Sequence, residues 1–222
     1  MTSWTKESLK GLSGEAELLA GALSQTYQLF LRALDYPDEE HCQWIREGGL
    51  ADPLRLGLAA ISPALEQPDE RWAALRGSYS ADDLAVEYTR LFDAGASGPP
   101  CPLYGGLYGG ARMKTMEEAV RFYNHFGLTL SEKQRELPDH IATQLEFLHY
   151  LTYREAEALQ SGGDAGPYQR AQRDFVARHP GAWLPKLCVR LENEKAHPFF
   201  LALFGCLADL LAHERARLGE AT

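Results

Sequence analysis

The stretch that most constrains the fold is residues 137–151, where a proline and an acidic residue precede a long apolar run. Pro138 suits the first turn of a helix, because its missing N–H group costs no hydrogen bond there. Asp139 would place a negative charge beside the positive end of the helix dipole. The apolar residues that follow recur at spacings of three and four and form a wide stripe. The sequence therefore predicts a central helix, running to about Gln160, that is packed by neighbours on several sides.

Apolar residues at helical spacing recur through the rest of the chain, between breaks marked by glycine and proline. Helices are expected over 15–34, 38–46, 51–65, 69–75, 81–92, 116–126, 137–160, 168–178 and 183–196, with a last one from Pro198. No segment shows the sustained alternation that marks a strand. We therefore expect an all-α fold, a single bundle over 15–222 of about nine or ten helices, preceded by a mobile tail at 1–14.

Local signals refine three of these boundaries. Ser80 is a typical N-cap residue. Thr115 and Glu118 have the spacing of a capping box and predict a helix that begins at Met116. Gly127 suits the position just after the end of that helix.

Residues 93–112 are too rich in glycine and proline for a regular element, and they exceed the usual length of a loop. They also contain apolar residues, among them Leu103, Tyr104, Leu107 and Tyr108, which a flexible linker would not need. We therefore expect an ordered hinge loop packed against both helical halves. Such a hinge is compatible with a monomer or a domain-swapped dimer.

The net charge of −9 argues against nucleic acid as a partner, because phosphate binding requires clustered Lys and Arg, and it suits a basic peptide. The four cysteines form no Cys-x-x-Cys pair and are interpreted as reduced thiols of a cytoplasmic protein. No apolar run approaches the length of a membrane span, and the first 14 residues lack the apolar core of a signal peptide.

Four motifs occur in order between about residues 84 and 190. They are Glu87-Tyr88 with Leu91-Phe92, the proline-rich loop 99–104, Pro-Asp-His at 138–140 with its helix, and Phe175, His179 and Trp183. Together they resemble the TorD/NarJ family of cytoplasmic chaperones for molybdenum-containing oxidoreductases. Tyr104 is followed by two glycines where that family often has Tyr-x-Ser, and this loop is more similar to chaperones of the type II dimethyl sulfoxide reductase group. The first 75 residues match only in being helical.

The resemblance implies an all-helical protein without catalytic turnover, cofactor or metal. It implies binding of the twin-arginine signal peptide of a molybdopterin enzyme, and of the apo catalytic subunit, until the cofactor is inserted and export is permitted. The candidate partner-binding residues are Glu87, Tyr88, Pro100, Tyr104, Asp139, His140, Glu146 and Phe147. Carboxylates suit the two arginines through paired hydrogen bonds, and a helical groove suits an apolar stretch.

Five of these residues also have a purely structural interpretation. Glu87 could reach solvent or pair with an arginine, Asp139 could simply charge a helix start, and Tyr104 could simply fix the hinge. His140 could be a satisfied core histidine, and Phe147 could be core packing.

Three other functions remain open on the sequence. Glu146 with His149, and Glu194 with His197, have the Glu-x-x-His spacing of a di-iron helical bundle, although Pro198 breaks the second helix. A thiol enzyme built on Cys101 lacks an obvious base. A helical adaptor without a signal-peptide partner is the third.

Overall fold

The computed structural model describes residues 13–96, 98–129 and 136–220, which contain ten α-helices and two isolated bridges but no strands. The helices are α1 (Glu15–Ala33), α2 (Glu39–Arg46), α3 (Ala51–Ile61), α4 (Asp69–Arg76), α5 (Ala81–Tyr88), α6 (Arg112–His125), α7 (Ile141–Gln160), α8 (Gly166–Arg178), α9 (Pro180–Asn193) and α10 (Pro198–Glu220). Short turns of other helix types lie at Pro63–Leu65, Thr89–Asp93 and Gly105–Leu107. The all-α prediction is confirmed.

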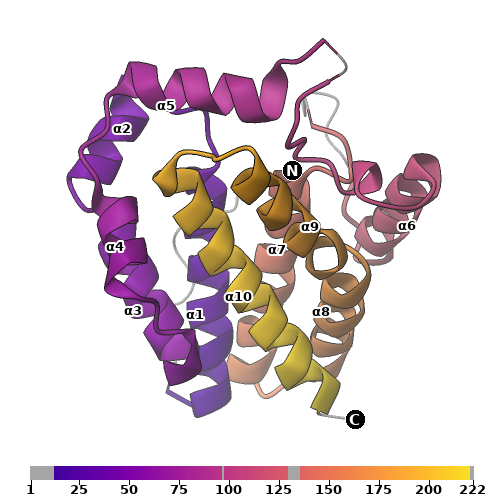
Figure 1. Ribbon diagram of the computed structural model, residues 1–222. Helices are drawn as coiled ribbons and strands as arrows, with labels where there is room; N and C mark the ends of the chain where they lie inside the picture. Colours follow the sequence, from indigo (N-terminus) through magenta and orange to yellow (C-terminus); the bar gives the residue numbers. More distant parts are fainter. Residues whose placement is uncertain (1–12, 97, 130–135, 221–222) are drawn as a thin grey trace.

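The long helices α1, α7 and α10 lie at the centre of the bundle, and α1 packs along α7 (Figure 1). Helices α2, α3 and α4 form an outer layer on one side, α5 runs across the top end, and α8 and α9 cover the other side with α6 beyond them. One cluster of buried side chains contains residues from all ten helices, and also Cys101, Leu103 and Tyr108 from the hinge loop. The segments before and after the hinge therefore share a single core.

The hinge loop 93–112 is fixed at several points. The amide of Cys101 donates to the carbonyl of Leu91, and the amide of Ile141 donates to the carbonyl of Leu103. Further along, the ring of Tyr108 stacks on Trp183 of α9, with ring centroids 5.1 Å apart. The loop therefore joins the end of α5, the start of α7 and the side of α9.

Two of the three local signals are confirmed. The Ser80 hydroxyl accepts a hydrogen bond from the amide of Asp83 and caps α5. Gly127 follows the end of α6 with φ +71°, in the left-handed region that favours glycine. The capping box is wrong, because α6 begins earlier, at Arg112, and Thr115 lies inside its first turns. The Glu118 carboxylate instead pairs with Arg178 of α8.

The predicted start of the central helix is also wrong. Helix α7 begins at Ile141 and its N-cap is His140, whereas Pro138 and Asp139 lie in the preceding turn. The physical reason is that the hinge loop takes the polar groups of this turn: both the carbonyl and the carboxylate of Asp139 accept hydrogen bonds from it. Asp139 therefore does not share a helix face with Glu146.

The remaining differences concern helix ends. Residues 51–65 form α3 and a separate 3-10 turn, because Pro63 cannot continue the helix. Helix α9 begins at Pro180, directly after α8, instead of at Trp183. Most of the predicted tail at 1–14 lies outside the described residues. Among those that are described, no helix combines the length and apolarity needed to cross a membrane.

Candidate functional site

The hinge loop and the start of α7 together form what we call the hinge site, defined by Asp93, Tyr104, Glu136, Asp139 and His140. Its backbone is held by an isolated antiparallel bridge between Tyr104 and His140. The amide of Gly105 also donates to the carbonyl of Asp139 at 2.9 Å. Two residues that the sequence motifs placed more than 30 positions apart are thereby brought side by side.

Asp139 lies at the buried inner end of this site. Its side chain has no exposed surface, and Oδ2 accepts a hydrogen bond of 3.0 Å from the amide of Gly106. A Cβ atom at Gly106 would lie 2.9 Å from that oxygen and 3.0 Å from the Cα of Arg112, so only glycine allows this close approach. Within the described residues Oδ1 has no hydrogen-bond partner, which leaves one lone-pair face of a buried carboxylate unsatisfied.

His140 is held as a neutral side chain. Its Nδ1 accepts a hydrogen bond from the amide of Ala142, as an N-cap side chain does. Its ring meets the ring of Tyr104 edge-on at 4.9 Å. Desolvation by burial lowers its pKa below the usual value and outweighs the opposing effect of Glu136, whose carboxylate lies 3.7 Å from Nε2.

The outer part of the site carries two carboxylates. Glu136 accepts a hydrogen bond of 2.6 Å from the Tyr104 hydroxyl. Burial and then the charge of Glu136 raise the pKa of Asp93. No Lys or Arg of the described chain pairs with either one, and the guanidinium of Arg112 lies 5.8 Å from the Tyr104 ring centroid. Among the described residues, the two carboxylates therefore have no cationic side chain paired with them.

Three exposed apolar side chains lie close to the hinge site along the chain. Leu107, Met113 and Leu137 are among the exposed large hydrophobic residues of the protein, at 41%, 65% and 40% exposure. Leu107 follows Gly106, Met113 follows Arg112, and Leu137 follows Glu136. Gly106 lies against both Arg112 and the Asp139 carboxylate. The hinge site thus combines negative charge with exposed apolar surface.

The hinge site includes two carboxylates that the sequence motifs did not indicate. Glu136 directly precedes the 137–151 stretch, and Asp93 begins the hinge loop. The sequence signal that could have indicated these two residues is that each lies next to a motif. Nothing in the sequence showed that they belong to the same site.

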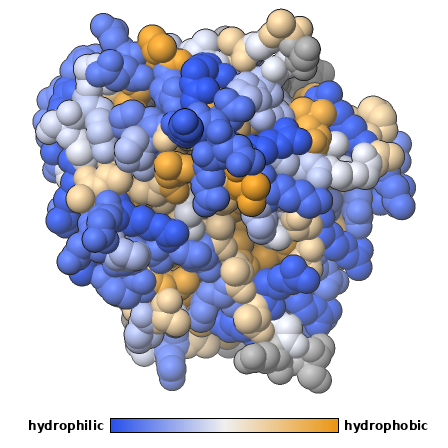
Figure 2. Space-filling view, in the orientation of Figure 1, coloured by the Kyte–Doolittle hydropathy of each residue, from blue (hydrophilic) through white to orange (hydrophobic). Residues whose placement is uncertain are grey.

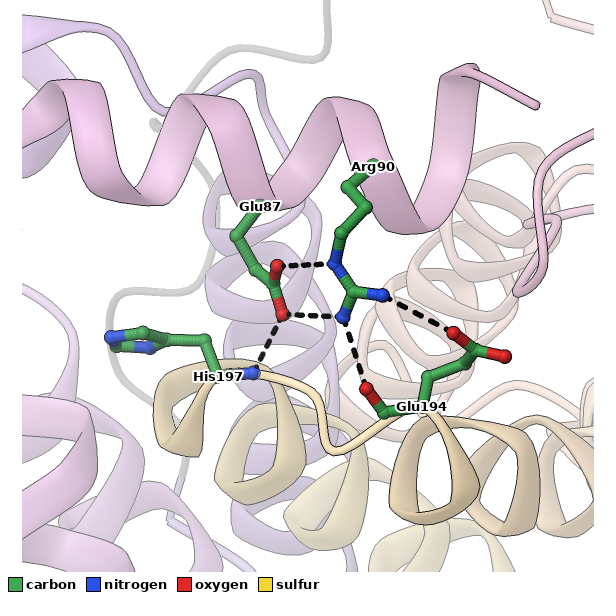
Figure 3. Close-up of polar contacts among 4 residues, drawn as sticks. All are labelled: Glu87, Arg90, Glu194 and His197. Atoms are coloured by element: carbon green, nitrogen blue, oxygen red, sulfur yellow. Dashed lines mark hydrogen bonds and ion pairs between the residues drawn. The ribbon is translucent and has the colours of Figure 1, made fainter.

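Glu87 lies elsewhere, between α5 and the turn that precedes α10 (Figure 3). Its carboxylate accepts two hydrogen bonds from Arg90, at 2.7 and 3.0 Å, and one of 2.9 Å from the amide of His197. Arg90 extends the cluster to the carboxylate and the carbonyl of Glu194. The hydrogen bonds from Arg90 hold the pKa of Glu87 below its usual value. Its structural interpretation, pairing with an arginine, is confirmed.

The other candidates do not join the hinge site. Tyr88 packs edge-on against Phe92, and its hydroxyl faces the carbonyl of Leu34. The carbonyl of Pro100 accepts a hydrogen bond from Arg190.

Phe147 is completely buried among the aromatic rings of α6 and α8, so its side chain is not available to a partner in this structure. Glu146 is half-buried, and burial raises its pKa. Its Oε2 has no hydrogen-bond partner among the described residues.

The geometry gives the two enzyme hypotheses no support. The ring of His149 forms hydrogen bonds with Ser24 and Gln28 of α1. The carboxylate of Glu194, just after the C-terminal end of α9, is bound by Arg90 instead. In the described ranges no three His, Cys, Asp or Glu residues come together as a metal ion would require. Burial raises the pKa of the Cys101 thiol to about 11, which opposes a nucleophilic role.

Comparisons with known proteins agree on one family. The family model "Nitrate reductase delta subunit" matches residues 48–189, a range that includes the whole hinge site. The chain is 33% identical to the chlorate reductase assembly chaperone protein of Ideonella dechloratans, covering 90% of this chain and 91% of that one. It is 34% identical to the selenate reductase assembly chaperone protein of Thauera selenatis, with 90% and 91% covered. The dimethyl sulfide dehydrogenase assembly chaperone protein of Rhodovulum sulfidophilum is 30% identical, with 90% and 82% covered.

The family-model match spans most of the chain, from α3 through most of α9, and these relatives align over nearly their full lengths. This chain therefore belongs to the nitrate reductase delta subunit family, the TorD/NarJ family that its motifs resemble.

Proposed function

We propose that this protein is a cytoplasmic maturation chaperone without catalytic activity. Its client would be the catalytic subunit of a molybdenum-containing oxidoreductase of the type II dimethyl sulfoxide reductase group. The protein would bind that subunit in its apo form, and its twin-arginine signal peptide, before cofactor insertion and export. Relatives over nearly the full length are named assembly chaperones for chlorate reductase and selenate reductase, which supports this proposal.

One observation carries the peptide-binding part: the hinge site has carboxylates that pair with no Lys or Arg among the described residues, and exposed apolar side chains lie close to it along the chain. A twin-arginine peptide offers the complement, two guanidinium groups followed by an apolar stretch. Guanidinium groups bind carboxylates through charge-assisted hydrogen bonds, and Glu136 is accessible to form them, with 40% of its side chain exposed. Leu107, Met113 and Leu137 would contact the apolar stretch.

In this proposal Asp139 stabilises the site from the interior of the protein and does not contact the peptide. Its buried charge adds to the negative potential, and its hydrogen bond to Gly106 holds the loop that carries Tyr104 and Leu107. Glu87 would act at a different surface, because it lines a cavity with Asp82, Asp83 and Lys195.

Isothermal titration with a synthetic twin-arginine peptide tests the proposal. Glu136→Gln keeps an acceptor for the Tyr104 hydroxyl but removes the charge, and Asp93→Asn does the same at an exposed position. Each should weaken binding by about tenfold, the effect of losing one charge-assisted hydrogen bond. Glu117→Gln on the exposed side of α6 is the matched control.

An unchanged affinity in the Glu136→Gln, Asp93→Asn double variant would remove the hinge site from the proposal. The client is tested separately, by co-purification of the full chain from its source cells. Recovery of the molybdoenzyme subunit by wild type, and its loss in the double variant, is the expected result.

A further inference from the structure

A cation, Arg112, lies beside the hinge site at the first position of α6. Its guanidinium is 5.8 Å from the centroid of the Tyr104 ring, within the range of a cation–π contact. The side chain is exposed and forms no ion pair or hydrogen bond with another described residue. In the orientation of Figure 1, Figure 2 shows mainly hydrophilic side chains at the edge where α6 lies, with apolar ones among them. Arg112 is therefore held near the site by an aromatic ring and not by a carboxylate.

The charge of Arg112 does not suit its place in the helix. The N-terminus of a helix carries partial positive charge, so its first turn favours Asp and Glu and disfavours cations. The first turn of α6 contains no acidic residue, and its N-cap, Ala111, has no side-chain group that could accept a hydrogen bond. The helix itself therefore gives no reason for a cation at this position. The contact with Tyr104 is the interaction that the structure offers in its place.

The hinge loop fixes where this guanidinium can reach. A Cβ atom at Gly106 would lie 2.8 Å from the Cγ of Arg112 and 3.0 Å from its Cα, so the start of α6 is in close contact with the loop. Tyr104 lies two residues before Gly106, and its hydroxyl donates to the Glu136 carboxylate at 2.6 Å. Burial, and then this hydrogen bond, raise the pKa of Tyr104, whereas the charge of Arg112 lowers it. Arg112 therefore lies over a ring that is bonded to the accessible carboxylate of the site.

We infer that Arg112 is an internal competitor for the arginines of the bound peptide. This inference rests on the proposed function and adds a regulatory residue to the same site. One peptide guanidinium would bind Glu136, and its neighbour would replace Arg112 on the Tyr104 ring, because planar guanidinium groups stack on aromatic faces. Until it is displaced, Arg112 also repels the two incoming cations. Arg112 thereby lowers the affinity of the site, and its release from Tyr104 is a step of peptide binding.

Isothermal titration of the full-length protein with a synthetic twin-arginine peptide tests this inference. Arg112→Gln removes the guanidinium but keeps the Cβ and Cγ atoms, and with them the contact with Gly106. Arg112→Lys keeps the charge but lacks the planar group. Arg121→Gln is the matched control, because it removes the same charge from an exposed position about 13 Å further along α6, beyond the screening length at physiological salt. Circular dichroism shows that each variant is folded.

Arg112→Gln should bind the peptide about three- to tenfold more tightly than wild type, because neither a cation–π contact nor a like charge has to be overcome. Arg112→Lys should lie between the two, and Arg121→Gln should bind as wild type does.

Two NMR measurements follow the displacement itself. The Nε–H signal of Arg112, identified by its absence from the spectrum of Arg112→Gln, should move to the position of a free arginine when the peptide is added. N-acetyl-arginine amide is a probe that lacks the apolar stretch of the peptide. It should shift the amide signals of Gly105 and Gly106 with a midpoint at least about threefold lower in Arg112→Gln than in wild type.

Peptide binding by Arg112→Gln that equals or falls below that of wild type would overturn the inference, as would an equal gain in Arg121→Gln. The proposed function would survive that result if Glu136→Gln still lost affinity. If wild type bound no twin-arginine peptide, the proposed function would be wrong, and the titration with N-acetyl-arginine amide would decide the inference. A lower midpoint in Arg112→Gln would then support it, and equal midpoints would refute it.

Discussion

At the scale of single residues, His179 shows how burial fixes a protonation state. Its ring is almost fully buried against Phe175 and Phe122, and neither nitrogen has a hydrogen-bond partner among the described residues. Desolvation lowers its pKa to about 4, although the charge of Glu118 opposes this. The protein therefore carries a histidine at this position that is neutral throughout the physiological range.

This burial predicts a pH dependence of stability. In the unfolded chain His179 takes up a proton near pH 6.5, whereas in the folded chain it does so only near pH 4. The unfolded state therefore binds more protons between these values, and the free energy of unfolding falls as the pH drops through that window. The loss should reach about 3 kcal/mol for His179 alone.

Urea unfolding of wild type and His179→Phe at neutral pH and at pH 4 measures this contribution. The phenylalanine cannot be protonated and keeps the ring contacts, so the variant should lose about 3 kcal/mol less than wild type over the same interval. Other buried histidines are present in both proteins and cancel in the comparison. Equal losses would show that His179 is not buried as described.

A second residue-scale prediction concerns Gly106. An alanine there would press its Cβ against the Asp139 carboxylate and against the backbone of Arg112, which cannot move freely. Gly106→Ala should lower the free energy of unfolding by about 1–3 kcal/mol and should also weaken twin-arginine peptide binding, because the hinge loop is displaced from α7. Gly163→Ala, where the nearest atom is 3.4 Å away, is the control. Unaltered stability and affinity would contradict the close approach.

At the scale of helices, the Glu87 cluster joins α5 to the start of α10. The Glu87 carboxylate accepts the amide of His197, which α10 leaves without an intrahelical partner. It also orients Arg90, which reaches the end of α9 through Glu194. Helix α5 is thus held, by four residues, to the connection between α9 and α10, which follows about a hundred residues later in the chain (Figure 3).

Glu87→Ala should therefore destabilise the protein by about 1–2 kcal/mol, since it removes the acceptor of a helix-terminal amide and a partly exposed ion pair. Urea unfolding measures this, with Glu117→Ala as control because that exposed carboxylate only approaches Arg121 at 3.9 Å. The effect should shrink in acid: the lowered pKa of Glu87 means that its stabilisation is present above pH 4.5 and is lost as the pH falls below that value. A Glu87→Ala variant as stable as the control would contradict this role.

At the scale of the whole molecule, ionic groups are buried where the C-terminal helix packs into the bundle. The side chain of Glu214 is 1% exposed and accepts two hydrogen bonds from Arg217, at 2.9 and 2.6 Å. Nearby on α7, Glu155 accepts hydrogen bonds from Gln169 and Gln172 of α8. The interior where α7, α8 and α10 meet therefore contains polar groups, and its two buried carboxylates both have hydrogen-bond partners.

Arg217→Met should destabilise the folded protein by about 3–5 kcal/mol, because it leaves the Glu214 carboxylate buried without its partner. Replacing both residues, with Glu214→Leu and Arg217→Met, should recover most of that loss, since apolar side chains need no partner there. Global urea unfolding followed by circular dichroism measures both variants. A double variant no more stable than Arg217→Met would contradict the assignment of the cost to the unpaired charge.

The expected monomer or domain-swapped dimer remains a prediction for the whole molecule. In one chain the helices on both sides of the hinge loop already share one core. Sedimentation at several protein concentrations distinguishes the two states.

The sequence by itself determined the all-α class and most of the helices. Helical periodicity and the breaks at glycine and proline are local properties, as the cap at Ser80 and the left-handed turn at Gly127 illustrate. It also carried the family motifs. Local signals failed where distant groups compete for the same polar atoms: Pro138 and Asp139 have the pattern of a helix start, yet the hinge loop binds Asp139 and moves the start to Ile141.

Only the tertiary structure decided which candidate residues lie together. Tyr104, Asp139 and His140 meet because the loop pairs with the start of α7, whereas Phe147 is enclosed by rings from α6 and α8. Glu136 became part of the site, and Glu87 was bound to the start of α10, through contacts between segments far apart in the chain. The spacing of residues along a helix fixes which side chains share a face, but the burial and charge of each side chain depend on what the rest of the chain packs against it.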